Sequence, residues 1–120
     1  MNQKYNNRQV GTSYEDLAIK YLESNGYHIL EKNFRCRMGE IDIIAIDENC
    51  LVFIEVKYRK DNKSGYAIEA VTKSKQRTIF KVAEFYMQKN NIQENTPSRF
   101  DIIGFDGCNI SHVKNAFGGM

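Results

Sequence analysis

The stretch that decides the fold is GEIDIIAIDENCLVFIEVKYR, residues 39–59. Its two halves, residues 39–47 and 50–59, each predict a β-strand, the first because apolar and polar residues alternate along it. Asp47, the last residue of the first run, is separated from the second run only by Glu48 and Asn49. The two strands are therefore expected to form a tight antiparallel hairpin.

Two segments outside this hairpin have the 3.6-residue periodicity of an amphipathic helix. The first covers residues 13–25, with Ser13 as its N-cap. The second follows Thr72 or Ser74, either of which can cap it, and runs to about residue 90. We therefore expect one helix before the hairpin and one after it.

Further strands are expected at residues 27–34, 99–106 and 109–115. The order helix, three strands, helix, two strands favours an α/β fold with a mixed central sheet of about five strands flanked by helices. The length of 120 residues is that of one domain. We expect this domain to cover residues 12–117, after a loose polar arm at residues 1–11.

The composition excludes several classes of protein. With 42% hydrophobic and 27% charged residues, the chain is not expected to be disordered or of low complexity. No apolar run approaches the ~20 residues of a transmembrane helix, and the polar start lacks the centre of a signal peptide. A soluble, cytoplasmic protein without a membrane partner is therefore expected. Cys36, Cys50 and Cys108 cannot all pair and have no CxxC spacing, so we expect ordinary thiols.

Positive charge is concentrated in one part of the chain. The net charge is only +2, but the segment from Lys57 to Lys81 carries a local charge of +6 and the remainder carries −4. Such segregation favours a face that binds a polyanion, and a solvated helix face is the alternative. The residues expected to contact nucleic-acid phosphates are Arg59, Lys60, Lys63, Lys73, Lys75 and Arg77.

Glu55 and Lys57 lie two residues apart in the second hairpin strand, so their side chains point to the same face. A turn centred between residues 48 and 49 pairs residues whose numbers sum to 97, which places Asp42 opposite Glu55 and Glu40 opposite Lys57. Opposed carboxylates destabilise a sheet unless a cation lies between them. Mg²⁺ or Mn²⁺ fits oxygen ligands of this kind, and Lys57 could orient an attacking water. The alternatives are an ion pair on a solvated strand face and a three-residue loop that shifts the register.

Glu15 in the first helix is a further candidate acid. It aligns with Ala18 and Leu22 at the border of the apolar stripe, so its carboxylate can reach a site on the sheet. The alternative is a first-turn acid that interacts favourably with the helix dipole. Asp16 is better explained as part of the helix cap.

These residues resemble those of a known class of enzymes. The pattern I-D-x(12)-E-V-K, which contains Asp42, Glu55 and Lys57, resembles the PD-(D/E)xK signature of restriction-endonuclease-like nucleases, with isoleucine where proline often stands. Longer patterns resemble the YraN family of small bacterial proteins, over about residues 10–115. They are G-x-x-x-E-D-L-A at Gly11–Ala18, N-F-R-C-R-M-G-E-I-D-I-I-A at Asn33–Ala45, L-V-F-I-E-V-K-Y-R at Leu51–Arg59 and R-F-D-I-I at Arg99–Ile103.

The resemblance implies a restriction-endonuclease-like core related to archaeal Holliday-junction resolvases. It implies that three acids bind Mg²⁺ or Mn²⁺ and that a lysine positions the attacking water; the residues are Glu15, Asp42, Glu55 and Lys57. Gln76 resembles a glutamine that follows E-x-K on a helix in some such nucleases. Phe80 departs from that pattern, because an aromatic hydroxyl is often found there. Gln76 and Glu40 are therefore expected to support the site rather than to form it.

The expected function is that of a metal-dependent endonuclease that hydrolyses phosphodiester bonds in DNA, with branched or damaged DNA as one class of substrate. The alternative is a non-catalytic nucleic-acid-binding or adaptor protein that retains the nuclease fold, and it is favoured if the carboxylates bind no metal. Nucleases that cut two strands often dimerise, so a homodimer is compatible with the first interpretation.

Overall fold

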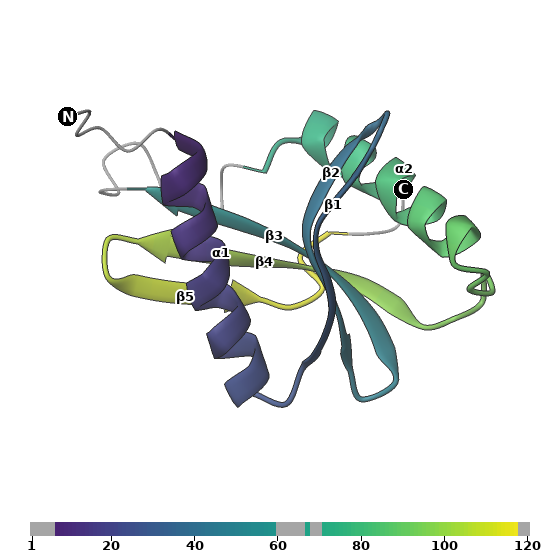
Figure 1. The fold of residues 1–120 in the computed structure, drawn as a ribbon, viewed down its shortest axis with the longest axis horizontal. Helices are drawn as coiled ribbons and strands as arrows, with labels where there is room; N and C mark the ends of the chain where they lie inside the picture. Colours follow the sequence, from purple (N-terminus) through teal and green to yellow (C-terminus); the bar gives the residue numbers. More distant parts are fainter. Residues whose placement is uncertain (1–6, 60–66, 68–70, 118–120) are drawn as a thin grey trace.

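The computed structural model describes residues 7–59, 67 and 71–117, with side chains from residue 13 onward. Its elements are α1 (Asn7–Ser24), β1 (His28–Cys36), β2 (Gly39–Asp47), β3 (Cys50–Arg59), α2 (Lys73–Lys89), β4 (Ser98–Asp106) and β5 (Asn109–Val113) (Figure 1). The described strands form one sheet in the order β1-β2-β3-β4-β5, in which only β3 and β4 are parallel. The predicted element order and the α/β fold with a mixed five-stranded sheet are confirmed.

Helix α1 begins earlier than the sequence predicted. It begins at Asn7 rather than at Ser13, so residues 7–11 of the expected arm are helical, while residues 1–6 lie outside the described part of the chain. Polar residues do not end a helix by themselves, because each residue added to an existing helix gains a hydrogen bond without a new nucleation cost. Ser13 is therefore not an N-cap, and Asp16 is not part of a cap; its carboxylate forms an exposed ion pair with Lys32 at 3.2 Å.

The N-terminus of α2 follows the prediction. Thr72 is the N-cap, and its hydroxyl oxygen accepts a hydrogen bond from the backbone N–H of Lys75 at 3.1 Å. The carbonyl oxygen of Thr72 accepts a second one from the N–H of Gln76 at 2.9 Å. These bonds fix the position of the first turn of α2 relative to the segment before it.

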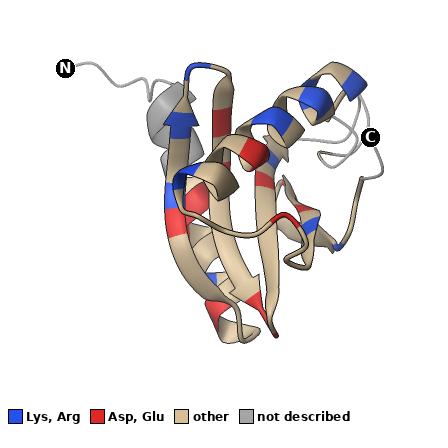
Figure 2. Ribbon diagram, turned by 90° about the vertical axis from the view of Figure 1, so that its right-hand side faces the viewer, with Lys and Arg blue, Asp and Glu red and all other residues tan. Residues whose placement is uncertain are grey.

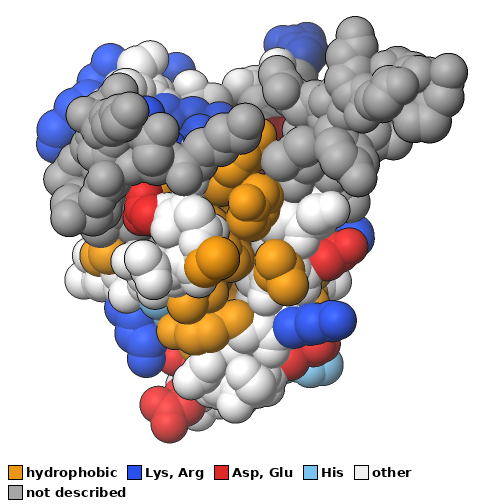
Figure 3. Space-filling model, turned by 90° about the vertical axis from the view of Figure 1, so that its left-hand side faces the viewer, with side chains coloured by type: hydrophobic (Ala, Val, Ile, Leu, Met, Phe, Trp, Pro, Cys, Tyr) orange, Lys and Arg blue, Asp and Glu red, His pale blue; other side chains and the backbone are white. Residues whose placement is uncertain are grey.

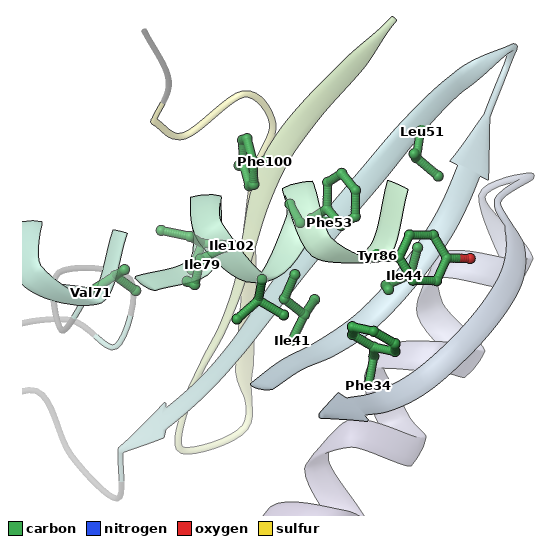
Figure 4. Packing of buried hydrophobic residues seen from close by; sticks show 12 residues of the cluster. Phe34, Ile41, Ile44, Leu51, Phe53, Val71, Ile79, Tyr86, Phe100 and Ile102 are labelled. Carbon is green, nitrogen blue, oxygen red and sulfur yellow. The ribbon is translucent and has the colours of Figure 1, made fainter. Parts of the chain in front are cut away.

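The two helices cover opposite faces of the sheet, and each covers its own hydrophobic core. Under α2, the rings of Phe53 and Phe100 stack with centroids 5.4 Å apart, and Tyr86 meets Phe53 edge-on at 6.0 Å (Figure 4). Under α1, Ala18 and Leu22 pack against residues of the central strands, namely Ile43, Ala45, Val52, Ile54, Ile103 and Phe105. Both faces of β2, β3 and β4 are thus buried, as expected where helices cover a sheet on both sides.

Hydrophobic side chains are also exposed on the side of the molecule that Figure 3 shows. Exposed large hydrophobic residues include Leu17 of α1, at 50% relative accessibility, and Ile110 of β5, at 41%. Single exposed hydrophobic residues are common on folded proteins. No helix in the described ranges is long and apolar enough to cross a membrane. Cys36, Cys50 and Cys108 are free thiols, as predicted.

Candidate active site

The β2–β3 hairpin has the predicted register. Its paired residues run from Ile43–Ile54 to Asp47–Cys50. Glu48 and Asn49 form a two-residue turn, and both have positive φ, 52° and 71°. A type I′ turn requires positive φ at both of its central residues. The loop is therefore two residues long and leaves the predicted register intact.

Regular pairing of β2 with β3 ends just before Asp42. Beyond Ile43–Ile54 no further pair forms in this ladder, so the predicted pairing of Asp42 with Glu55 does not continue it. Ile43 packs in the core under α1 and Ile41 in the core under α2, although residues two apart share a face in a regular strand. The pleat is thus interrupted at Asp42, and its Oδ2 accepts a hydrogen bond from the backbone N–H of Val56 at 2.8 Å. The Asp42 carboxylate thus accepts the hydrogen bond from Val56 N–H in place of a backbone carbonyl oxygen.

This interruption separates Glu40 from the site. The predicted position of Glu40 opposite Lys57 is wrong, because β2 continues along β1 there and Glu40 is paired with Arg35. The Glu40 carboxylate forms an ion pair with the guanidinium of Arg35 at 3.4 Å. Glu40 therefore contributes to the negative potential around the site but does not face Lys57.

Glu55 is the most buried charged residue of the candidate site. Its side chain is 5% exposed, and its Oε2 lies 3.4 Å from Nζ of Lys57 and 3.6 Å from Nζ of Lys75. As predicted from the alternation of side chains along β3, Glu55 lies on the same face as Leu51 and Phe53, the face that α2 covers. The buried carboxylate is thus balanced by two ammonium groups, of which the sequence predicted only that of Lys57.

Asp42 lies close enough to Glu55 for the two carboxylates to influence one another. Burial, followed by the Glu55 charge, raises the pKa of Asp42 from its ordinary value of 3.8 to about 8, while the hydrogen bond from Val56 acts in the opposite direction. Like charges in a low-dielectric environment disfavour double ionisation. A cation bound between the two carboxylates would relieve this repulsion, as the sequence analysis expected of opposed carboxylates.

Glu15 lies at the edge of this group. It is half-buried two turns into α1, so the alternative role as a first-turn acid is wrong. The pKa of Glu15 is raised above its ordinary value. Burial and the Glu40 charge raise it, and together they outweigh the hydrogen bond with Asn33, which lowers it. A pocket of about 240 Å³ is lined by Tyr14, Glu15, Val56, Lys57 and Tyr58. Glu15 and Lys57 thus open into the same space.

The donor atoms present fit a hard divalent cation. Mg²⁺ is commonly held by one or two carboxylates and keeps several waters, and Asp42 and Glu55 offer two carboxylates that influence one another. No group of three or more Asp, Glu, His or Cys side chains within the described residues has the spacing of a metal site. Asp42 and Glu55 are therefore the residues that could hold such an ion.

The predicted phosphate-binding residues fall into three groups. Lys73 and Arg77 are exposed on the first half of α2, where Figure 2 shows basic residues gathered. Lys75 belongs to the same half of the helix but contacts Glu55. Arg59 ends β3 and is half-buried. The other two, Lys60 and Lys63, lie outside the described residues.

Gln76 and Phe80 have structural contacts. The side-chain N–H of Gln76 donates to the carbonyl oxygen of Val71 at 3.3 Å, which supports the start of α2. The ring of Phe80 lies 4.5 Å from that of Phe100 and extends the core under α2. Among the described residues the Gln76 side chain has no hydrogen bond to the candidate carboxylates, and Phe80 packs where the resemblance would place a hydroxyl.

Sequence reasoning missed a second charged cluster, on the α1 side of β4. Asp101 is fully buried and accepts hydrogen bonds from Arg99 Nε at 3.0 Å, Tyr27 OH at 3.3 Å and His112 Nε2 at 2.8 Å. Burial alone would raise the pKa of Asp101, but the bonds from His112 and Arg99 outweigh it and lower the pKa. Arg99 also donates to Asp47 at 2.9 Å. The i, i+2 spacing of Arg99 and Asp101 in an apolar strand, the same spacing as in Glu55 and Lys57, could have identified it.

Comparison with known proteins finds similar sequences in several bacteria. A family model with the description "Uncharacterised protein family UPF0102" matches residues 14–105, which include all the candidate carboxylates. A UPF0102 protein of Lachnoclostridium phytofermentans is 45% identical over 112 residues, 93% of this chain and 95% of that protein. Another, from Persephonella marina, is 47% identical over 107 residues, 89% and 91% of the two chains. A third, from Clostridioides difficile, is 46% identical over 114 residues, 93% and 99% of the two chains.

Proposed function

The chain belongs to the uncharacterised protein family UPF0102, which is the YraN family, and on that premise we propose that it is a metal-dependent endonuclease that hydrolyses phosphodiester bonds in DNA. The observation that carries the proposal is the pair Asp42 and Glu55 with Lys57 beside it. A pair of mutually repelling carboxylates inside a sheet costs stability, and such costs are commonly retained at functional sites.

In this proposal Asp42 and Glu55 hold Mg²⁺ or Mn²⁺, and Glu15 supports them by binding water at the edge of the site. When bound there, the cation supplies a Lewis acid that stabilises negative charge developing on a phosphodiester oxygen. The Lys57 ammonium has three donors and no acceptor, so it orients the attacking water and donates to a phosphate oxygen. Lys57 is thus a catalytic residue and not a ligand.

The basic residues around α2 are proposed to bind the DNA backbone. Lys73 and Arg77 are exposed on the same helix whose Lys75 reaches Glu55, so a phosphate chain along α2 would pass close to the carboxylates. Arg59, at the end of β3, extends this charge toward Lys60 and Lys63 in the sequence. Contacts of this kind are independent of base sequence. Branched or damaged DNA is the proposed class of substrate, on the ground of the family resemblance alone.

One observation favours the alternative, a non-catalytic nucleic-acid-binding protein. No three-ligand metal group exists among the residues that the structure describes, and two ammonium groups already balance Glu55. A protein that only binds nucleic acid would keep the basic face and have no need of a cation between the carboxylates. The two functions therefore differ in whether a divalent cation binds to the carboxylates and is required for activity.

The deciding experiment incubates the purified protein with linear, flapped and four-way DNAs in Mg²⁺, in Mn²⁺ or in EDTA. Cleavage with either cation and none with EDTA is expected for wild type. Asp42→Asn and Glu55→Gln should abolish cleavage, whereas Glu84→Gln, which changes an exposed acid on α2, should not. DNA binding without cleavage in any cation would support the non-catalytic alternative instead.

A further inference from the structure

Lys75 has a position that differs from that of an ordinary surface lysine. Its Nζ lies 3.6 Å from Glu55 Oε2, the same oxygen that Lys57 contacts, and the Glu55 side chain is 5% exposed. Ion pairs between exposed side chains contribute little, but a pair in which one partner is buried compensates a desolvated charge. Lys81, on the same helix, is exposed and forms no ion pair among the described residues. The contact of Lys75 with the site is therefore specific to its position.

The two lysines on Glu55 are held differently. Lys57 is on the same strand as Glu55, two residues away, so the pleat of β3 keeps the two side chains on one face. Lys75 comes from α2, and only its backbone is fixed, by the hydrogen bond to the Thr72 cap. Its side chain is 39% exposed and ends a flexible four-carbon stem. Lys75 can therefore turn away from Glu55 toward solvent without any movement of the sheet.

A divalent cation and Lys75 would compete for the same carboxylate. A cation between Asp42 and Glu55 adds positive charge next to the Lys75 ammonium, and like charges at such separations repel strongly where water is scarce. Of the two lysines, Lys75 is the more exposed, at 39% against 32% for Lys57, and it is the one that does not share the strand of Glu55. A nucleic-acid phosphate next to the cation then offers the displaced ammonium a new anionic partner, since Lys73 and Arg77 on the same part of α2 are exposed for such contacts.

We propose that Lys75 is an exchangeable counter-ion, which balances Glu55 in the metal-free protein and moves to a nucleic-acid phosphate when a divalent cation binds. It thereby couples the two ligands: metal binding frees Lys75 for the phosphate, and the phosphate removes the competitor of the metal. Such coupling is reciprocal, so each ligand raises the affinity for the other by the same factor. The inference rests on the proposed function, because it requires a site that binds both ligands. Lys75 acts on the cation through Glu55 and is a positioning residue.

The test compares Lys75→Met, which keeps the stem and removes the charge, with the matched control Lys81→Met on the same helix. Mn²⁺ titration of the DNA-free proteins by calorimetry should give Lys75→Met about fivefold tighter binding than wild type, the effect of removing a competing ion pair of about 1 kcal/mol. Lys81→Met should bind Mn²⁺ as wild type does. Lys75→Arg, which keeps the charge, should also retain wild-type affinity.

A second measurement uses the anisotropy of a fluorescent DNA duplex with and without Ca²⁺. The factor by which Ca²⁺ tightens DNA binding should fall toward one in Lys75→Met and persist in Lys81→Met. Lys75→Gln serves as a second neutral variant if Lys75→Met unfolds at the assay temperature, which circular dichroism reports. If wild type binds Mn²⁺ and Glu55→Gln does not, unchanged or weaker Mn²⁺ binding in both neutral variants would overturn the role of Lys75 and leave the proposed function standing. A wild type that binds no Mn²⁺ would overturn the proposed function as well.

Discussion

Replacing Asp42 by Asn should stabilise the protein at alkaline pH and change its stability much less in mild acid. Asn keeps an oxygen that can accept the hydrogen bond from Val56, but it cannot ionise beside Glu55. The pKa of Asp42 is raised from 3.8 to about 8. Because the folded-state value lies above the unfolded one, the stability linked to protonated Asp42 is fully present below pH 4. It is lost as the pH rises through about 8.

The size of this effect follows from the same pKa. Each pH unit between the unfolded and folded values corresponds to about 1.4 kcal/mol, which gives an upper limit on the order of 6 kcal/mol for ionisation of Asp42 at pH 9. Water entry and movement of the two lysines near Glu55 reduce the penalty, so we expect Asp42→Asn to be more stable than wild type by about 1–3 kcal/mol at pH 9. At pH 5 the same linkage gives an upper limit of about 2 kcal/mol, so the two proteins should differ by less than about 1 kcal/mol.

The assay is urea unfolding followed by circular dichroism at pH 5 and pH 9, in EDTA. Glu84→Gln, which changes an exposed carboxylate on α2, serves as the control and should behave as wild type at both pH values. Mg²⁺ or Mn²⁺ at millimolar concentration should stabilise wild type at pH 9 and not Asp42→Asn. The reasoning would be refuted if the difference between wild type and Asp42→Asn were the same at both pH values, or if the variant were less stable at pH 9.

Lys57→Ala should lower cleavage by orders of magnitude and keep Mn²⁺ binding in calorimetry, because an ammonium orients water and is not a ligand; equal loss of both would instead indicate collapse of the site. Replacing Lys73 and Arg77 together by Ala should weaken binding to all duplexes alike and reduce the slope of log affinity against log salt by about one to two, and an unchanged slope in an anisotropy titration would exclude this face as the DNA-binding surface. Asp101→Ala should lower the free energy of unfolding by about 3–5 kcal/mol, because it removes the buried acceptor shared by Arg99, Tyr27 and His112, and a loss below about 1 kcal/mol in urea titration would contradict this. Since the pKa of Asp101 is lowered, that contribution is lost as the pH falls through the folded value, so the difference between Asp101→Ala and wild type should shrink in acid.

The central hairpin could be predicted from sequence because its determinants are local. Alternation along β3 assigns Leu51, Phe53 and Glu55 to one face, and the two-residue turn at Glu48 and Asn49 fixes which residues of β2 they meet. Periodicity and turn chemistry act over a few residues, so a single chain reveals them. The contact of Lys57 with Glu55 followed from these two facts, and so did the closeness of Asp42 to Glu55, although the strand ladder itself ends at Ile43 and Ile54.

The same local information does not extend beyond the point where regular pairing ends. The pleat is interrupted at Asp42 because β2 leaves β3 and follows β1, and this interruption removes Glu40 from its predicted place opposite Lys57. The early start of α1 at Asn7 is a related case. Its polar first residues have no strong helix signal of their own, and they are helical because they extend the helix that follows them. Both differences arise where one element is shaped by a neighbour.

The sequence by itself determined the order of the elements, the register of the central hairpin up to Ile43 and the contact of Lys57 with Glu55, because these depend on residues close together in the chain. Only the tertiary structure decided that Lys75 reaches Glu55 from α2 and that His112 joins Asp101 from β5. Those contacts depend on how a helix and an outer strand pack against the sheet. Packing is set by the summed burial of both cores, which no local periodicity encodes.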